Sequence, residues 1–282
     1  MSGLVLSLFP GVDLLGRAFA AAGFVVVTGP DRVTGGDVRD FAGMPGRFDG
    51  IIGGPPCQGF SATNMHRSNP RHKSVRLSRE MLGHFVRIVE ECRPRWFLCE
   101  NVPAVPNVRV PGFPYVQRLP LCDWECGGVQ IRTRHIQFGH AESWIIRPER
   151  SVIERSKIGR KPEAITTKPV SRWESYALHC RKQGLPESLA LPGWTKEAKF
   201  RAVGNGVPLA MGRALAAAVV NASPKDAADC PCGCGRRLVG KQRASTASCR
   251  KRLQMMRDCP RDVVDRDGYH EFADPVARAS TS

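Results

Sequence analysis

The chain has 282 residues, 42% of them hydrophobic, which suits one main domain with a buried core and one or two small additions. Its formal net charge is +16 and its pI is about 9.8. Such a basic chain favours a polyanionic partner, because lysine and arginine displace counterions from a phosphate backbone. Of the eleven cysteines, several lie in apolar runs, such as Cys92 and Cys99, and three crowd together at Cys230, Cys232 and Cys234. Residues 3–9 lack the basic leader of a secretory signal. A secreted disulfide scaffold is therefore disfavoured, and we expect a cytoplasmic protein without a membrane-spanning stretch.

Short apolar runs alternate with helical patterns over the first hundred residues. The predicted strands are Gly3–Phe9, Phe24–Val27, Asp49–Gly53 and Arg95–Cys99, and the predicted helices are Leu14–Ala22 and Arg79–Cys92. This alternation predicts βαβ units, an α/β fold with a doubly wound, Rossmann-like parallel sheet. Ligands of such sheets bind at the carboxyl ends of the strands, so the segments that follow the strands are the candidate site.

The turn after the third strand is the sharpest motif. Its sequence, Gly53 to Ser61, reads GGPPCQGFS. Two glycines and two prolines predict a rigid turn that presents Cys57 at the end of a strand. Exposure and nearby positive dipoles would lower the pKa of this thiol and make it a nucleophile. A buried structural cysteine is the alternative.

Two other strand ends carry weaker motifs. Glu100 follows an apolar strand, where burial would raise its pKa and let the carboxyl hold or donate a proton. A capping or ion-paired glutamate is the alternative. Gly11, after the first strand, would let backbone amides approach a ligand closely, or would simply form a turn.

Taken together, these motifs resemble the cytosine-5 DNA methyltransferase family. Pro56-Cys57-Gln58 and Glu100-Asn101-Val102 match two of its motifs, and the others occur in the family's order. They are Phe9-Pro10-Gly11, Gly36-Asp37-Val38, Gln130-Ile131-Arg132-Thr133-Arg134 and Gly204-Asn205-Gly206-Val207-Pro208. The resemblance covers residues 3–139 and 197–220 and implies that family's methyltransferase sheet.

The resemblance implies a reaction and its residues. The cofactor would be S-adenosylmethionine, and the partner would be double-stranded DNA with the target cytosine flipped out. Cys57 would add to C6 of the base, Glu100 would bind its N3 edge, and Arg134 with Arg132 would steady the adduct. The implied cofactor-binding residues are Phe9, Pro10, Gly11, Asp31, Asp37, Pro55, Asn205 and Val207. Asp31 is the candidate ribose-binding acid. Asp13 departs from the family pattern, which has a second glycine there.

Four regions are expected. Residues 1–139 form the first part of the catalytic domain, 140–196 a small target-recognition region, 197–222 the closing catalytic segment, and 223–282 a basic, Cys-rich tail. The loop from Ser61 to Arg79 has five lysines or arginines and no acidic residue, so we expect it to close over DNA. The aromatic residues of the recognition region, Trp144, Trp173, Tyr176 and Trp194, are expected in the core.

The tail has its own chemistry. Cys230, Cys232, Cys234 and Cys249, with Cys259 downstream, offer enough thiols for a tetrahedral structural zinc site. Residues 230–257 hold eight lysines or arginines and no acidic residue. A zinc-stapled, DNA-binding module that is separable from the catalytic domain is predicted. A disordered basic tail is the alternative.

Other functions stay open. The chain could be an RNA cytosine-5 methyltransferase, could transfer a modified methyl group from an altered cofactor, as Asp13 allows, or could be a non-catalytic DNA-binding relative. The intact Cys57, Glu100 and Arg134 disfavour the last. We expect a monomer in the cytoplasm of a bacterial or phage-infected cell. The sequence leaves open the DNA site that is read and a role in restriction-modification or regulation.

Overall fold

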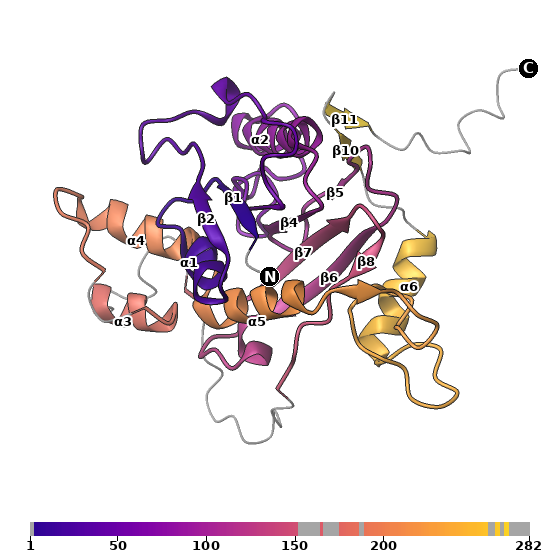
Figure 1. The fold of residues 1–282 in the computed structure, drawn as a ribbon. Helices are drawn as coiled ribbons and strands as arrows, with labels where there is room; N and C mark the ends of the chain where they lie inside the picture. The colour runs from indigo at the N-terminus through magenta and orange to yellow at the C-terminus, as the bar shows by residue number, and fades with distance from the viewer. Residues whose placement is uncertain are drawn as a thin grey trace, which may run out of the picture.

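A six-stranded sheet organises the molecule (Figure 1). The computed structural model describes residues 3–151, 164–165, 175–185, 189–258, 263–265 and 268–270. The sheet has the order β2-β1-β3-β4-β7-β6. Its strands are β1 (Leu4–Leu8), β2 (Val25–Thr28), β3 (Gly50–Gly53), β4 (Trp96–Asn101), β6 (Val116–Cys122) and β7 (Thr133–His140).

The sheet is parallel over β2, β1, β3 and β4, as the βαβ pattern predicts. Beyond β4 the sheet is mixed, because β7 runs antiparallel to both β4 and β6. The connection from β6 to β7 holds only the short 3-10 helix η2 (Asp123–Cys126) and a turn. Parallel strands need a crossover of a dozen or more residues, so this short connection returns antiparallel.

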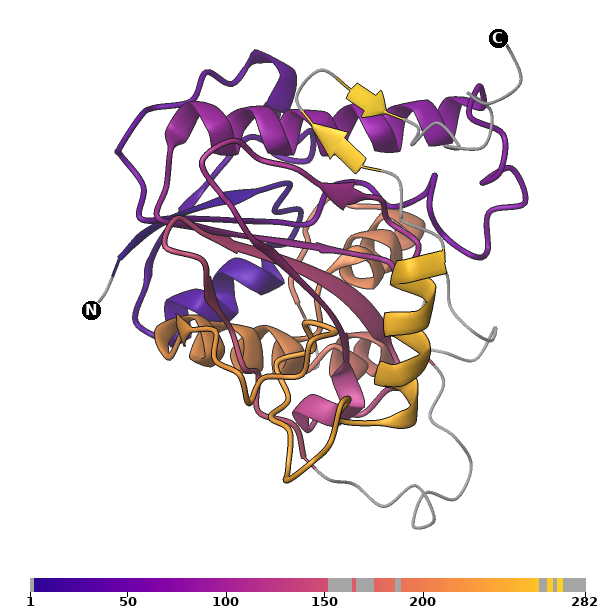
Figure 2. The ribbon, with the colours of Figure 1, turned by 90° about the vertical axis from the view of Figure 1, so that its right-hand side faces the viewer.

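Helices cover both faces of the sheet, which gives three layers (Figure 2). Helix α2 (Lys73–Cys92) lies on one face, and α1 (Leu14–Ala21) and α5 (Leu209–Val220) lie together on the other. Successive strand residues point to opposite faces. In β3, Ile51 therefore packs with the α2 side chains, and Ile52 packs with those of α1 and α5.

Helix α2 begins earlier than the sequence predicts. It starts at Lys73 and not at Arg79, so the basic loop after Ser61 ends at His72. The reason is that Val75 and Ser78 already lie on the buried face of the helix, with exposed fractions of 1% and 0%. The side chain of His72 caps this end by accepting from the amide of Ser74.

The remaining elements lie outside the six-stranded sheet. They are η1 (Val38–Asp40), β5 (Asn107–Val108), β8 (Trp144–Ile145), α3 (Tyr176–Lys182), α4 (Lys196–Asn205), β9 (Ser223–Pro224), α6 (Ala247–Asp258), β10 (Val263–Asp265) and β11 (Gly268–His270). Strand β9 pairs with β8, and β10 pairs with β5.

The described residues after 222 contact the rest of the molecule, and the separable tail that the sequence predicts stays a prediction. Besides the β8–β9 pair, Arg147 forms an ion pair with Asp229 at 2.6 Å, and the buried amide of Gln117 in β6 donates to the carbonyl of Gly233 at 3.0 Å. Figure 1 shows α6 beside β6 and β8. Residues 223–258 therefore pack against the sheet.

Residues 140–196, for which the sequence predicts a recognition role, are described only in part, and Trp173 lies outside the described residues. Trp144 is half-buried and stacks on His140 with ring centroids 4.8 Å apart. Tyr176 and Trp194 are also half-buried, and Tyr176 packs edge-on against Phe200 of α4. Helix α3 thus lies against the closing catalytic segment.

One stretch, residues 196–220, is long and apolar enough by composition to span a membrane, which corrects the sequence-based statement that none is. This stretch consists of α4 and α5, separated at residues 206–208. Of its most apolar window, 61% is buried within the molecule. The buried core helices of folded domains also reach this length and apolar composition, so the stretch is weak evidence for a membrane span.

Candidate active site

A single pocket gathers the residues that the sequence singles out. It lies at the carboxyl ends of β1, β3 and β4 and is closed by residues 131–134, 164–165 and the α4–α5 turn. All the predicted catalytic and cofactor-binding residues line it: Phe9, Pro10, Gly11, Asp31, Asp37, Pro55, Cys57, Glu100, Arg132, Arg134, Asn205 and Val207. Their placement agrees with the motifs, and their chemical roles stay predictions.

The turn that carries Cys57 is packed tightly. The carbonyl of Cys57 accepts from the amides of Phe60 and Ser61, at 2.9 and 3.0 Å, which closes a helical turn after the cysteine. A Cβ atom at Gly59 would lie 2.7 Å from the Ser74 carbonyl oxygen. Only glycine allows the turn to lie this close to the first turn of α2, so the glycine of the motif sets where the half-buried thiol lies.

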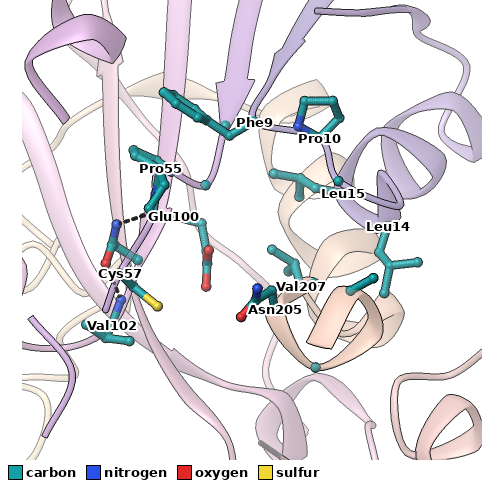
Figure 3. A pocket seen from close by; sticks show the side chains of 18 of the residues that line it. Phe9, Pro10, Leu14, Leu15, Pro55, Cys57, Glu100, Val102, Asn205 and Val207 are labelled. Carbon is teal, nitrogen blue, oxygen red and sulfur yellow. Dashed lines mark hydrogen bonds between the residues drawn. The ribbon is translucent and has the colours of Figure 1, made fainter. Parts of the chain in front are cut away.

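Asn101 holds the same turn from the neighbouring strand. Its buried Nδ2 donates to the carbonyl of Pro55 at 3.0 Å, and its Oδ1 accepts from the amide of Val102 at 2.9 Å (Figure 3). The sequence places Asn101 in a motif but gives it no role. The structure shows that it ties the Cys57 turn to the end of β4.

Glu100 points into the pocket between Cys57 and Asn205 (Figure 3). Its Oε1 lies 2.8 Å from Nε of Arg134, and both side chains are largely buried. A Cβ atom at Gly54 would lie 3.1 Å from Oε2 of Glu100, so this glycine leaves room for the carboxyl. Burial raises the pKa of Glu100 and outweighs the opposing effect of Arg134.

The thiol of Cys57 departs from expectation. Its pKa is raised, chiefly by burial and then by the nearby negative charge of Glu100, while Arg134 and Arg132 act in the opposite direction. The sequence predicts a lowered pKa from local dipoles. In the protein without substrate, desolvation is the larger effect, because a thiolate loses more hydration than a thiol.

Arg132 is placed differently from the role that the resemblance implies. Its terminal nitrogens donate to the carbonyls of Ile165 at 2.7 Å and Gly204 at 2.6 Å, and only 5% of the residue is exposed. Burial, and then the neighbouring Arg134, lower the pKa of Arg132 to about 9, so it remains charged at neutral pH. Its hydrogen bonds make it a clamp in the pocket wall, and Arg134 is the arginine that contacts Glu100.

The cofactor half of the pocket is built from an unusual turn and two carboxylates. Phe9, Gly11 and Asp13 all have left-handed backbones, with φ of 54°, 56° and 52°. Asp31 joins this turn to the end of β2, because its Oδ2 accepts from the amide of Gly11 at 3.0 Å. Asp37 caps η1 and pairs with Arg39 at 2.8 Å. Both carboxylates keep acceptor sites for further donors.

The structure accounts for Asp13, which stands where the family pattern has a second glycine. The left-handed backbone would suit the usual glycine, and aspartate is among the few other residues that tolerate it. Its Oδ1 accepts from the Ser7 hydroxyl at 2.8 Å and from the amide of Gly16 at 3.0 Å, so Asp13 is the N-cap of α1. Burial raises the pKa of this carboxyl.

Two buried glutamines that the sequence analysis did not assign hold the rear wall together. Gln130 donates to Oε1 of Gln183 at 3.0 Å and accepts from the amide of Ile165 at 3.0 Å. Gln183 donates to the carbonyls of Val203 and Gly206, at 2.6 and 2.9 Å. Gln130 begins the Gln-x-Arg-x-Arg motif, which was the available signal. Gln183 has no local signal.

A second group of reactive residues lies away from the pocket. Cys230, Cys232, Cys234 and Cys249 are all buried, and their sulfur atoms lie within 4.8 Å of one another, an arrangement that could hold a metal ion. This agrees with the ligand set that the sequence predicts. Cys259 lies outside the described residues.

Comparisons with known proteins agree with this geometry. Residues 6–109 match the family model for C-5 cytosine-specific DNA methylase. The type II methyltransferase M.FnuDI of Fusobacterium nucleatum is 30% identical over 124 residues, which are 37% of this chain and 34% of that protein. M.AgeI of Thalassovita gelatinovora is 31% identical over 182 residues, which are 51% of this chain and 41% of that protein. The chain thus spans about a third to two fifths of these relatives' length.

Solved structures share the fold. The Entamoeba histolytica methyltransferase EhMeth matches with a TM-score of 0.56 and 12% identity, over 78% of this chain and 98% of that chain. A Spodoptera frugiperda DNMT2 mutant matches with a TM-score of 0.51 and 12% identity, over 78% of this chain and 100% of that chain. The fold is thus a methyltransferase fold, and the matched sequence segment contains β1, the Cys57 turn and Glu100. The sequence match to the C-5 cytosine-specific DNA methylase family is thus confined to residues 6–109, and the solved structures extend the likeness of fold beyond it.

Proposed function

We propose that the protein is a DNA cytosine-5 methyltransferase that transfers a methyl group from S-adenosylmethionine to C5 of a cytosine. One observation carries the proposal: Cys57 and the Glu100–Arg134 ion pair face the same pocket as the Gly11 turn and its carboxylates. A nucleophile, a proton-holding acid and a cofactor cradle on one sheet edge are the parts that this reaction needs.

The pocket suits S-adenosylmethionine. A Cβ atom at Gly11 would meet no atom within 4 Å, so open space lies over the turn. Asp31 and Asp37 line one side and can accept hydrogen bonds from ribose hydroxyls and an adenine amino group. Val207 lines the pocket from the start of α5 and offers apolar contact. When bound, the cofactor supplies an electrophilic methyl group.

Cys57 and Glu100 together would activate the base. The C5 carbon of cytosine is a weak nucleophile until the Cys57 thiolate adds to C6 and forms a C–S bond. The electron pair displaced by this addition moves into the ring. Glu100, whose pKa is raised by burial, is suited to give a proton to N3 and stabilise that charge. Arg134 keeps the carboxyl oriented at 2.8 Å.

The second half of the reaction returns the enzyme to its first state. The activated C5 attacks the methyl carbon, and a C–C bond replaces the carbon–sulfur bond of the donor. A base then removes the C5 proton, the C6–S bond breaks, and Cys57 leaves as a thiolate. Proton loss and thiolate expulsion restore the aromatic ring, so no oxidant or reductant is required.

The base has to leave the duplex for these contacts, because C6 and the N3 edge are covered in stacked, paired DNA. The protein offers a basic rim for the flanking phosphates. Ser61 and Thr63 line the pocket, and the exposed Arg67, Arg71 and Arg76 follow on the same loop and the first turn of α2. Such contacts make affinity fall as salt concentration rises.

The direct test is incubation with tritiated S-adenosylmethionine and mixed DNA and RNA, followed by nucleoside analysis. We expect label in 5-methyldeoxycytidine, and label only in RNA would favour the RNA alternative. Cys57→Ser should abolish transfer and adduct formation with 5-fluorocytosine DNA. Cys126→Ser, at a half-buried cysteine in η2, is the matched control and should retain both. Normal turnover by Cys57→Ser would rule out the covalent route.

Glu100→Gln tests the acid separately. The amide keeps the size of the side chain but cannot transfer the proton, so methylation should slow by about 10²–10⁴-fold. DNA binding should change much less. Equal losses in binding and in turnover would assign Glu100 to binding alone.

A further inference from the structure

We propose that Cys230, Cys232, Cys234 and Cys249 bind one zinc ion as four thiolates, and that this ion fastens the C-terminal segment to strand β6. We call residues 225–258 the cysteine lobe. The inference is independent of the methyl-transfer reaction, because none of the four thiols lines the catalytic pocket.

The spacing of the sulfur atoms fits one ion. Sγ of Cys230 lies 3.5 Å from Sγ of Cys232, and Sγ of Cys234 lies 3.7 Å from Sγ of Cys249. Four thiolates around a tetrahedral zinc with Zn–S bonds of about 2.3 Å lie about 3.8 Å apart. A disulfide would need about 2.05 Å, and all four cysteines are unpaired. A tetrahedral set of four sulfur ligands is typical of zinc.

The unusual Cys-x-Cys-x-Cys spacing follows from where the lobe lies. Gly233 and Gly235 separate the cysteines and have φ of +77° and +73°. A Cβ atom at Gly233 would lie 3.0 Å from the carbonyl oxygen of Arg118 in β6, and one at Gly235 would lie 2.8 Å from that of Ile146. The two glycines therefore lie against the backbone of the main domain, while the cysteines on either side of them turn toward one another. Alternation of cysteine and glycine in the sequence allows both contacts within one short turn.

Hydrogen-bond donors surround the sulfur atoms. The amide of Ser245 donates to Sγ of Cys230 at 3.4 Å, and the Thr246 hydroxyl donates to Sγ of Cys249 at 3.1 Å. A guanidinium nitrogen of Arg252 lies 3.2 Å from Sγ of Cys232. Four thiolates around Zn²⁺ carry a net charge of −2, so donors and a cation in this outer layer stabilise the site.

The lobe has few apolar contacts of its own. Among the described side chains, Leu238, Ala244 and Leu253 pack around the four cysteines. A segment with so few apolar contacts cannot repay the entropy of ordering its backbone, and in small folds a metal supplies that free energy. The zinc site would therefore be the core of the lobe.

The same segment is bonded to the sheet. Gln117 in β6 donates to the carbonyls of Gly233 and Ile146, at 3.0 and 2.8 Å, and Arg150 donates to the carbonyl of Cys234 at 3.2 Å. Strand β6 pairs in turn with β7, where Leu121 stands opposite Arg134. Zinc in the lobe would thus stabilise the hairpin that carries Arg134.

The test is metal analysis of the full chain, purified without an added metal or a metal-binding tag. We expect one zinc per chain. Cys234→Ser and Cys249→Ser should lose zinc, while Cys126→Ser should keep it. Absence of zinc, with all four thiols reacting freely with a thiol reagent, would overturn the proposal, as would an iron–sulfur cluster in their place.

A second measurement avoids variants that fail to fold. The wild-type chain is stripped with a chelator and reloaded with cobalt, which should produce the strong absorption of a tetrahedral cobalt–thiolate centre. Hydrogen exchange should rise in residues 116–122 on stripping and fall again when zinc is returned. Weak cobalt absorption would contradict four-thiolate ligation, and unchanged exchange in β6 would contradict the fastening role.

Discussion

At the scale of single residues, burial disfavours the charged forms of the two proposed reacting groups. Burial raises the pKa of both Cys57 and Glu100, and the charge of Glu100 raises the thiol's pKa further. Protonation of Glu100 would remove the negative charge that opposes the Cys57 thiolate. The groups are therefore coupled, and a bound base would change both.

This coupling predicts the pH dependence of alkylation at Cys57. Because its pKa is raised, the thiolate fraction at neutral pH is small, and the rate of reaction with iodoacetamide should keep rising above pH 9. Glu100→Gln removes a charge that raises this pKa, so the alkylation curve should move to lower pH. Mass spectrometry of the Cys57 peptide at several pH values measures the rate. Identical curves for the variant and the wild type would contradict the coupling.

Asp13 shows what a motif comparison alone misses at this scale. The substitution of aspartate for the family's glycine raises the question of an altered cofactor. The structure supplies a simpler reason, because the carboxyl caps α1 and accepts from Ser7. The residue keeps the left-handed backbone that the turn requires and adds a helix cap.

At the scale of elements, Arg132 connects segments that are far apart in the sequence. It stands just before β7 and donates to the carbonyls of Ile165 and Gly204. The hydrogen bond between Gln130 and Gln183 is a second link of this kind, because it joins the segment before β7 to the end of α3. The pocket wall therefore depends on polar groups that pair with buried backbone, and their loss would leave carbonyls without donors.

We predict that Arg132→Gln destabilises the fold and weakens cofactor binding. Each buried carbonyl left without a donor costs about 1–3 kcal/mol. Denaturant unfolding and calorimetric titration with S-adenosylmethionine measure the two effects. Arg213→Gln, at an exposed position on α5, is the matched control and should change stability by less than about 0.5 kcal/mol. Wild-type stability with lost turnover would instead assign Arg132 to chemistry.

The elements that the sequence predicts are those whose signal lies within a few neighbouring residues. Strands β1, β3 and β4 are short apolar runs, and the Cys57 turn is specified by its glycines and prolines. The start of α2 was misplaced because the polar His72–Ser74 segment hides its buried face. The β6–β7 hairpin was not among the predicted elements. The four cysteines of the lobe were predicted, but the packing of the lobe against β6 was not, because its bonds are remote in sequence. Gln117 and Gly233, for example, are separated by 116 positions and leave no periodic signal.

At the scale of the whole molecule, late segments of the chain pack against early ones. Its N-terminal half forms the sheet and the nucleophile turn, residues after 196 complete the pocket, and the cysteine lobe returns to the outer strand. The sequence motifs of the methyltransferase resemblance end at residue 220, whereas the described fold continues beyond it. The lobe thus lies outside these motifs and packs against the sheet.

Deleting residues 223–282 should therefore lower the stability of the catalytic domain. Gln117 would lose its bond to Gly233, and Arg147 would lose its ion pair with Asp229. We expect a lower melting temperature and reduced methyl transfer even at saturating DNA and low salt. Asp229→Asn, which weakens one of these contacts and leaves the lobe in place, should show a smaller shift. A truncated chain with wild-type melting and turnover would show that the lobe is separable after all.

The position of the lobe also bears on the outer edge of the sheet. Strand β6 is the last strand of the six-stranded sheet, and an uncovered edge offers unpaired amides and carbonyls to a strand of another molecule. Pro120 within β6 has no amide to offer, and Gly233 lies against the backbone at Arg118. The proline and the lobe together block the edge to a foreign strand. Oxidation of the four cysteines would release that cover, so oxidative damage to this protein should first appear as aggregation.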